Sequence, residues 1–262
     1  SAVSGAEGML RPVTPGAPWP RTLRMTSLRL LLPLLLCILL SGCMLNRVYA
    51  FKSQFCDYRA NFTLVVDNGV TLQMHSPVLL DTDVVWLIGA EPTAWNKNGS
   101  WLEMLYVVEK DLPAPTPEYA IPLRLLFSGG DRLLSAGTID KNLSAMITPG
   151  LIEETVAHAC SSETSMLRKN VEFDLSDLDR ADIPDRKQIL DALGPPQQTQ
   201  QAGRVMIYRF RLQGAAAGVE KSHAWIWLGP GGNEVERLRF RYLRYELDAD
   251  FIAGRGSIKI HL

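Results

Sequence analysis

Few residues in this sequence have the types and spacing that catalysis or metal binding requires. His158 and Cys160 stand two positions apart on an expected helix, so their side chains would point about 200° apart, poor geometry for sharing one metal ion. A run of aspartates carries the oxygen ligands that Ca²⁺ prefers: Asp174, Asp177, Asp179, Asp182 and Asp185. The run lacks the glycine and closing glutamate of an EF-hand loop, which favours helix capping over calcium binding. We therefore predict no metal, no cofactor and no catalytic residues.

An apolar stretch over residues 30–40 precedes all the helices and strands that we expect in the folded protein. This stretch is eleven residues long and contains Pro33, whereas crossing a bilayer takes about 20 apolar residues. Three arginines precede it within residues 21–29 and small residues follow it, the order of a secretory signal. We expect residues 1–42 to be a Pro-rich extension followed by an export signal that the mature protein loses.

The sequence Leu40-Ser41-Gly42-Cys43 resembles the lipobox of bacterial lipoproteins. The resemblance implies cleavage before Cys43 and lipid on its thiol and new amino group. Each buried methylene adds about 0.8 kcal/mol of membrane affinity, so several chains on one residue anchor a protein durably. Met44 stands where, in such lipoproteins, aspartate favours inner-membrane retention. We expect attachment through Cys43 at the periplasmic face of the outer membrane; the alternative is a core cysteine at a helix end.

Cys56 and Cys160 are the two cysteines that remain in the expected mature chain besides Cys43. In an oxidising compartment two such cysteines usually pair. A bridge between them would close a loop of about 105 residues, worth roughly 4.7 kcal/mol in the chain-entropy estimate. The alternative is two buried free thiols, each acting as a small hydrophobic side chain.

Apolar alternation, turn glycines and helix stops predict a similar order of elements in each half of the chain. In the first half the expected elements are a helix over 46–58, a hairpin over 62–74, a helix over 76–92, and strands over 100–110 and 121–139. In the second half they are a helix over 148–169, a strand over 170–175, a helix over 183–196, and strands over 204–213 and 223–247.

Matching residues recur at a nearly constant distance along the chain. Tyr106 and Tyr208 stand 102 positions apart, and so do Gly129 and Gly231. We therefore expect an α+β fold made of two tandem units, each with helices packed on one face of an antiparallel sheet. The first unit would span residues 43–147 and the second residues 148–262. The alternative is a coincidence of glycine and proline punctuation.

Two pairs of segments carry a resemblance to a known family. "DVVWLIGAEP" (83–92) precedes "WLEMLYVV" (101–108), and "RKQILDALGPP" (186–196) precedes "VMIYRFRL" (205–212). Each pair resembles the helix, Leu-Gly-x-Pro turn and tyrosine-containing strand of the BamE (SmpA/OmlA) lipoproteins of the outer-membrane β-barrel assembly machine. The tandem arrangement also resembles β-lactamase inhibitor protein. The resemblance implies a fold and a compartment, and no functional residue is transferred from it.

Charge and motif content narrow the function. The formal net charge is −1 and the basic residues are scattered, so no electrostatic footprint for nucleic acid is present. We expect a non-enzymatic, lipid-anchored interaction or accessory module that contacts another envelope protein, in envelope assembly or as a complex subunit. The alternative is a carrier of a small hydrophobic or lipid ligand, held between helix layer and sheet. An envelope hydrolase is less favoured because no nucleophile and base pair is visible.

Overall fold

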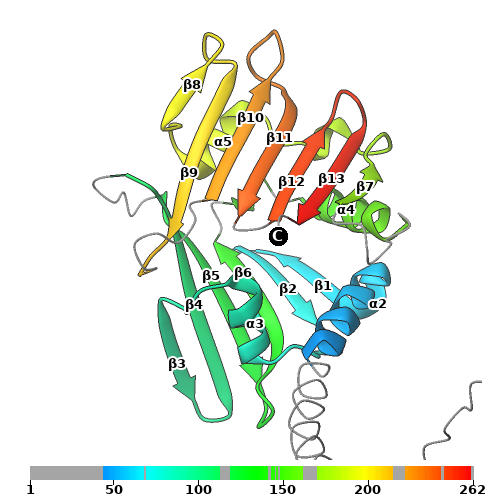
Figure 1. Ribbon diagram of the computed structural model, residues 1–262, viewed down its shortest axis with the longest axis vertical. Coiled ribbons are helices and arrows are strands. Elements are labelled where there is room, and N and C mark those ends of the chain that lie inside the picture. The colour runs from blue at the N-terminus through cyan, green and yellow to red at the C-terminus, as the bar shows by residue number, and fades with distance from the viewer. Residues whose placement is uncertain are drawn as a thin grey trace, which may run out of the picture. The chain divides into compact units, whose positions relative to one another are not determined.

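A single antiparallel sheet runs through the described part of the chain (Figure 1). The computed structural model describes residues 44–67, 69–112, 119–140, 143–144, 146, 148–161, 170–214, 222–242 and 245–260. Within these residues the sheet has thirteen strands, in the order β1-β2-β6-β5-β4-β9-β10-β11-β12-β13-β7, with β3 paired to β4 and β8 paired to β9. The bounds are β1 Phe62–Val66, β2 Gly69–Met74, β3 Ala94–Asn98, β4 Trp101–Lys110, β5 Ile121–Ser128, β6 Leu133–Asp140, β7 Asn170–Asp174, β8 Gln198–Gln200, β9 Val205–Leu212, β10 Ser222–Leu228, β11 Val235–Tyr242, β12 Tyr245–Asp250 and β13 Arg255–Ile260.

The predicted fold class, two tandem α+β units with helices on one face of each sheet, is wrong. Strands from both halves join one sheet, because β4 and β9 pair directly, with Val108 opposite Leu212. The ion pair between Glu109 and Arg211, at 2.9 Å, crosses this seam. Apolar alternation indicates which residues share a face, but it does not say which strand becomes the neighbour. The sequence therefore did not predict the junction that makes the sheet continuous.

The helices are short, and several end where local chemistry favours a stop. Their bounds are α2 Tyr58–Asn61, α3 Asp81–Ile88, α4 Pro149–Ser161 and α5 Arg186–Leu193, with the 3-10 helix η3 Arg180–Asp182 and a further helical stretch over residues 44–56. Gly89 ends α3 with φ of 72°, a left-handed conformation that glycine adopts without steric cost. Among the described helices, none combines the length and the apolar character needed to cross a bilayer.

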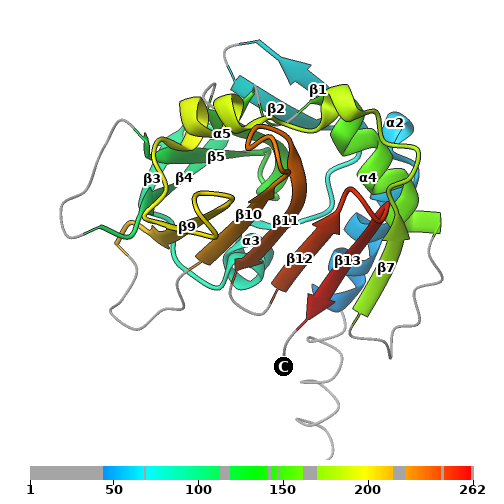
Figure 2. The same ribbon diagram turned by 90° about the horizontal axis from the view of Figure 1, so that it is seen from above.

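Two main cores lie between the sheet and its helices. In the first, Val84 of α3 packs with Met104 of β4, which is fully buried. In the second, Ile189 of α5 packs with Tyr208 of β9. Figure 2 shows α4 and α5 on one side of the sheet part that contains β10 to β13. A smaller cluster under α4, near the β7 edge, consists of Phe173, Leu175 and Ala249.

Candidate functional site: an apolar cavity beneath helix α4

An apolar cavity of about 400 Å³ lies between α4 and the sheet. Helix α4 lines it with Leu151, Ile152, Thr155 and Val156, positions that share one side of the helix. Of the lining residues that the structure describes, Thr155 alone has a polar side chain. A cavity with so few polar partners does not hold ordered water well and suits an apolar guest.

The floor of the cavity comes from three consecutive strands of the sheet. Ile226 of β10, Leu238 of β11 and Ala249 of β12 lie side by side because these strands are neighbours in the sheet. Phe173 of β7 closes one side, and Ile189 of α5 closes another. Ala249 has the smallest side chain of the five, so it leaves room above β12 that a larger residue would fill.

The N-terminal end of α4 is fixed by a specific contact with η3. Thr148 accepts a hydrogen bond from the Leu151 N–H at 3.1 Å, so it caps the helix, and its hydroxyl lies 2.8 Å from Asp182. Gly150 lies against the same carboxylate, which a Cβ atom at this position would overlap. A side chain at position 150 would therefore require the Asp182 carboxylate to move.

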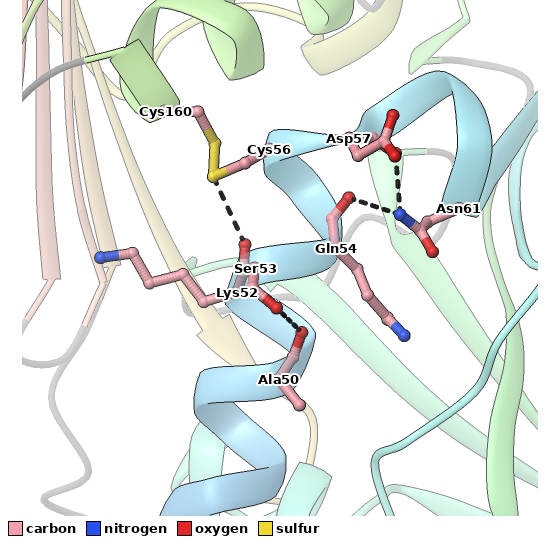
Figure 3. The surroundings of a disulfide bond; sticks show 8 residues. All are labelled: Ala50, Lys52, Ser53, Gln54, Cys56, Asp57, Asn61 and Cys160. Atoms are coloured by element: carbon pink, nitrogen blue, oxygen red, sulfur yellow. Dashed lines mark hydrogen bonds between the residues drawn. A yellow bond between two sulfur atoms is a disulfide. The ribbon is translucent and has the colours of Figure 1, made fainter.

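The other end of α4 is tied to the N-terminal helical stretch by the disulfide between Cys56 and Cys160 (Figure 3). The two Cα atoms are 5.1 Å apart, within the usual range for a disulfide. Arg59 adds an ion pair to Glu153 of α4 at 2.9 Å. The predicted pairing of the two cysteines is confirmed, and it holds α4, one wall of the cavity, against a segment 104 positions earlier in the sequence.

The opposite face of the same sheet part is charged and aromatic. Arg237 and Arg239 both donate to Asp248, with distances of 2.6 to 3.1 Å. These hydrogen bonds, those of Arg237 first, hold the pKa of Asp248 below its usual value despite partial burial. The guanidinium carbon of Arg237 lies 5.2 Å from the centre of the Trp227 ring. The rings of Trp225 and His223 stack, with 5.4 Å between their centroids.

A groove of about 680 Å³ opens on this charged face beside β13 and β7. Acidic and basic side chains alternate across its strands, since Arg237 stands opposite Asp250, and Asp250 stands opposite Arg255. Alternating charges of this kind neutralise one another, and such pairs contribute little free energy where water reaches them.

Two aspartates of the run cap helices, as predicted. Asp185 accepts from the Gln188 N–H at 2.8 Å and caps α5, while Asp179 accepts from the Ala181 N–H at 2.9 Å and caps η3. Asp174 accepts from the Ser176 N–H at 2.8 Å in the turn after β7. Within the described ranges, no group of three or more His, Cys, Asp or Glu side chains is arranged to hold a metal ion.

Some predicted site residues lie outside the described residues. Cys43, expected to carry the lipid, and the signal expected over residues 1–42 both belong to this group, as does the side chain of His158. The expectation of attachment through Cys43 therefore stays a prediction.

Sequence reasoning missed the cavity-lining residues as a set. The apolar positions of α4 were available as a signal, since Leu151, Ile152 and Val156 fall on one side of the expected helix. Nothing in the local pattern says that this side faces Leu247 and Ala249, about 90 positions later.

Comparisons with protein-family models, with curated proteins and with solved structures find no match to this chain.

Proposed function

We propose that this protein binds a small, uncharged apolar ligand, such as a single acyl chain, in the cavity beneath α4. The observation that carries the proposal is the lining, in which apolar side chains surround about 400 Å³ with Thr155 as the one polar side chain among the described lining residues. Ligand pockets in proteins typically measure about 300–1,000 Å³ and are predominantly apolar, with few polar groups that orient the guest.

The volume and the chemistry of the lining define the class of ligand. An apolar cavity of about 150 Å³ holds one benzene molecule, so this one has room for about 16 carbon atoms at the same ratio. A carboxylate or ammonium group inside would lose its hydration without gaining a partner, at a cost of several kcal/mol. A charged head group would therefore stay outside, and the buried part of the ligand is hydrocarbon.

The proposal includes no chemical reaction. Catalysis needs a nucleophile or a general base next to a place for substrate, and the described lining supplies neither. The disulfide supports an oxidising compartment, because such bonds persist outside the cytosol. Together with the lipobox-like sequence at Cys43, this supports a lipid-anchored protein at the periplasmic face of the outer membrane, as the resemblance to the BamE lipoproteins also suggests.

Titration with the neutral fluorescent probe N-phenyl-1-naphthylamine tests this function, because its emission rises in an apolar site. Replacement Ala249→Leu adds bulk to the cavity floor and should lower probe affinity by about tenfold or more. The matched control Ala253→Leu makes the same change at an exposed turn residue and should leave the affinity unaltered. Equal affinities for wild type and Ala249→Leu would show that the cavity is not the site.

The charged and aromatic sheet face favours a second candidate function, an interaction module for another envelope protein. Trp225, Trp227 and Arg237 lie together on this face, and tryptophan and arginine dominate the energetics of many protein interfaces. Purification from detergent-solubilised envelopes, with Trp225→Ala/Trp227→Ala as the comparison, tests this candidate. A partner that is retained by wild type and lost with the double variant supports it, and recovery of wild type alone contradicts it.

A further inference from the structure

Strand β3 forms a hairpin with the start of β4, which also pairs with β5 on its other side, so β3 is an edge strand. β3 pairs with β4 and lies off the main strand order, and all five of its residues are exposed. The chain turns at Gly99, whose φ is 60°, and at Ser100. Figure 1 shows this turn at the lower end of the sheet, at about the level of the turn between β5 and β6. The turn and all of β3 are thus exposed at one edge of the sheet, while the core begins at Leu102 of β4.

Two tryptophans and a lysine mark this tip. Trp95 is 48% exposed and Trp101 is 47% exposed, far more than such large apolar side chains usually are. Lys97 lies between them in sequence, and no aspartate or glutamate occurs over residues 93–102. Tryptophan is enriched at membrane–water interfaces, and lysine extends its ammonium group toward the head groups while its stem stays in apolar surroundings.

The strand register places the two indoles on opposite faces of the hairpin. Trp101 is opposite Asn98, whereas Trp95 is opposite Met104, three positions further along β4. Side chains of successive strand residues alternate between faces, so positions three apart differ in face. A protein surface docked on one face would cover one indole and leave the other in water. Entry of the tip into a lipid surface covers both, which favours a membrane over a protein partner.

The dimensions of the tip fit the interfacial layer. Trp95 is three residues from Asn98, the last residue of β3, a distance of about 10 Å at the rise of a β-strand. Interfacial protein elements bury their apolar side about 5–10 Å into the boundary between head groups and acyl chains. Tip-first entry to this depth would bring both indoles to the level that tryptophan prefers.

The N-terminal helical stretch also carries exposed apolar side chains near the end of the sheet where the β3–β4 turn lies. Leu45 and Tyr49 stand one turn apart on it and are 59% and 57% exposed. In Figure 1 the beginning of this helical stretch and the β3–β4 turn lie toward the same end of the long axis. The apolar residues 30–40 and Cys43 come just before this stretch in the sequence.

We propose that the β3–β4 tip, with Trp95, Lys97 and Trp101, is a membrane-contact element that enters the head-group region of a phospholipid bilayer. The proposal goes beyond ligand binding in the cavity and does not depend on it, since the hairpin belongs to a different part of the sheet from α4.

Tryptophan quenching by lipid tests the membrane contact in the full chain. The protein is reconstituted into phosphatidylethanolamine–phosphatidylglycerol vesicles in which part of the lipid carries brominated acyl chains, which quench indoles that reach them. Variant Trp95→Phe/Trp101→Phe should lower the quenchable part of the emission by about half or more. The matched variant Trp225→Phe/Trp227→Phe removes the same number of indoles from the other half of the sheet and should leave the quenchable part unaltered.

Because Trp19 and Trp86 are present in all three proteins, their emission is a common background. Because Trp95 and Trp101 are both exposed, the first variant should fold, and its circular dichroism spectrum should match that of wild type. If the first double variant quenches as strongly as wild type, or if the second loses as much as the first, the hairpin does not contact lipid and the proposal is wrong.

Discussion

The hydroxyl groups of Tyr106 and Tyr208 donate equivalent hydrogen bonds, although the residues stand 102 positions apart. Tyr106 Oη lies 3.2 Å from the carbonyl oxygen of Ala90, just after α3, and Tyr208 Oη lies 2.9 Å from that of Gly194, just after α5. Both side chains are almost completely buried. Each tyrosine thus ties the end of a helix to the strand beneath it, and the helices keep their positions over the sheet.

Replacement Tyr208→Phe should lower the free energy of unfolding by about 1–3 kcal/mol, because it leaves the buried Gly194 carbonyl without its donor. Tyr106→Phe should cost less, since its hydrogen bond is longer and partly exposed. Urea unfolding followed by circular dichroism measures both. Tyr49→Phe, at an exposed position, is the control and should have no effect. A Tyr208→Phe protein as stable as this control would contradict the proposed role of the hydrogen bond.

Stability should fall at alkaline pH because of buried phenols. Burial raises the pKa of Tyr242 to about 12, and it also raises the pKa values of Tyr106 and Tyr208. In the unfolded chain a tyrosine ionises near its usual pKa of about 10. The stability from these groups is therefore fully present below pH ~10 and is lost as pH rises through about 12. Urea unfolding across this range, with tyrosinate absorbance as a second signal, should show the fall; unchanged stability up to pH ~12 would refute it.

The ionised carboxylate of Asp248 should stabilise the folded protein at neutral pH, and this contribution should disappear in acid. Its pKa is lowered by the hydrogen bonds from Arg237 and Arg239, so its contribution is present above its unfolded pKa and is lost as pH falls through the folded value. Replacement Asp248→Asn should cost about 1–2 kcal/mol near neutral pH, less than a fully buried pair because water screens it.

The matched control for Asp248→Asn is Asp191→Asn, which breaks an exposed ion pair with Lys187 on α5. This change should leave stability almost unaltered, as exposed pairs of this kind contribute little. The measurement is urea unfolding near neutral pH and again below pH ~4. The gap between Asp248→Asn and wild type should narrow at the lower pH, and a gap that widens there would contradict the sign of the pKa shift.

The disulfide between Cys56 and Cys160 should contribute a large part of the stability. It closes a loop of 104 positions, for which the chain-entropy estimate is roughly 4.7 kcal/mol. The double variant Cys56→Ser/Cys160→Ser should therefore unfold at a markedly lower urea concentration than oxidised wild type. Wild type with added reductant is the control and should match the variant. If oxidised wild type and the variant unfold at the same urea concentration, the two cysteines are not bridged in solution.

Local elements were largely predictable because their signals are local. Helices α3 and α5 lie within the expected ranges 76–92 and 183–196 and end at Gly89 and Gly194, and Gly129 lies in the turn between β5 and β6. The expected helix over 76–92 begins too early. The helix begins at Asp81 because the carboxylate of Asp83 accepts a hydrogen bond from the Leu80 N–H at 3.0 Å.

The joining of the two halves and the cavity were not predictable, since both depend on contacts between distant segments. One strand pattern over residues 223–247 becomes β10, β11 and the first half of β12. Likewise, Val171 of β7 pairs with Ile258 of β13, nearly 90 positions later. Alternation has the same period in every strand and does not encode such partners. The space beneath α4 exists because of these pairings, so no local pattern could have located it.

The central claim, that an apolar guest occupies the space beneath α4, is tested most directly by a crystal structure of the protein grown with a long-chain alcohol that carries bromine at its far end. The account predicts an anomalous bromine peak between Val156 of α4 and Ala249 of β12, with the hydroxyl end outside. A structure in which α4 rests on the sheet with no space, or in which bromine is found at the surface alone, would contradict it.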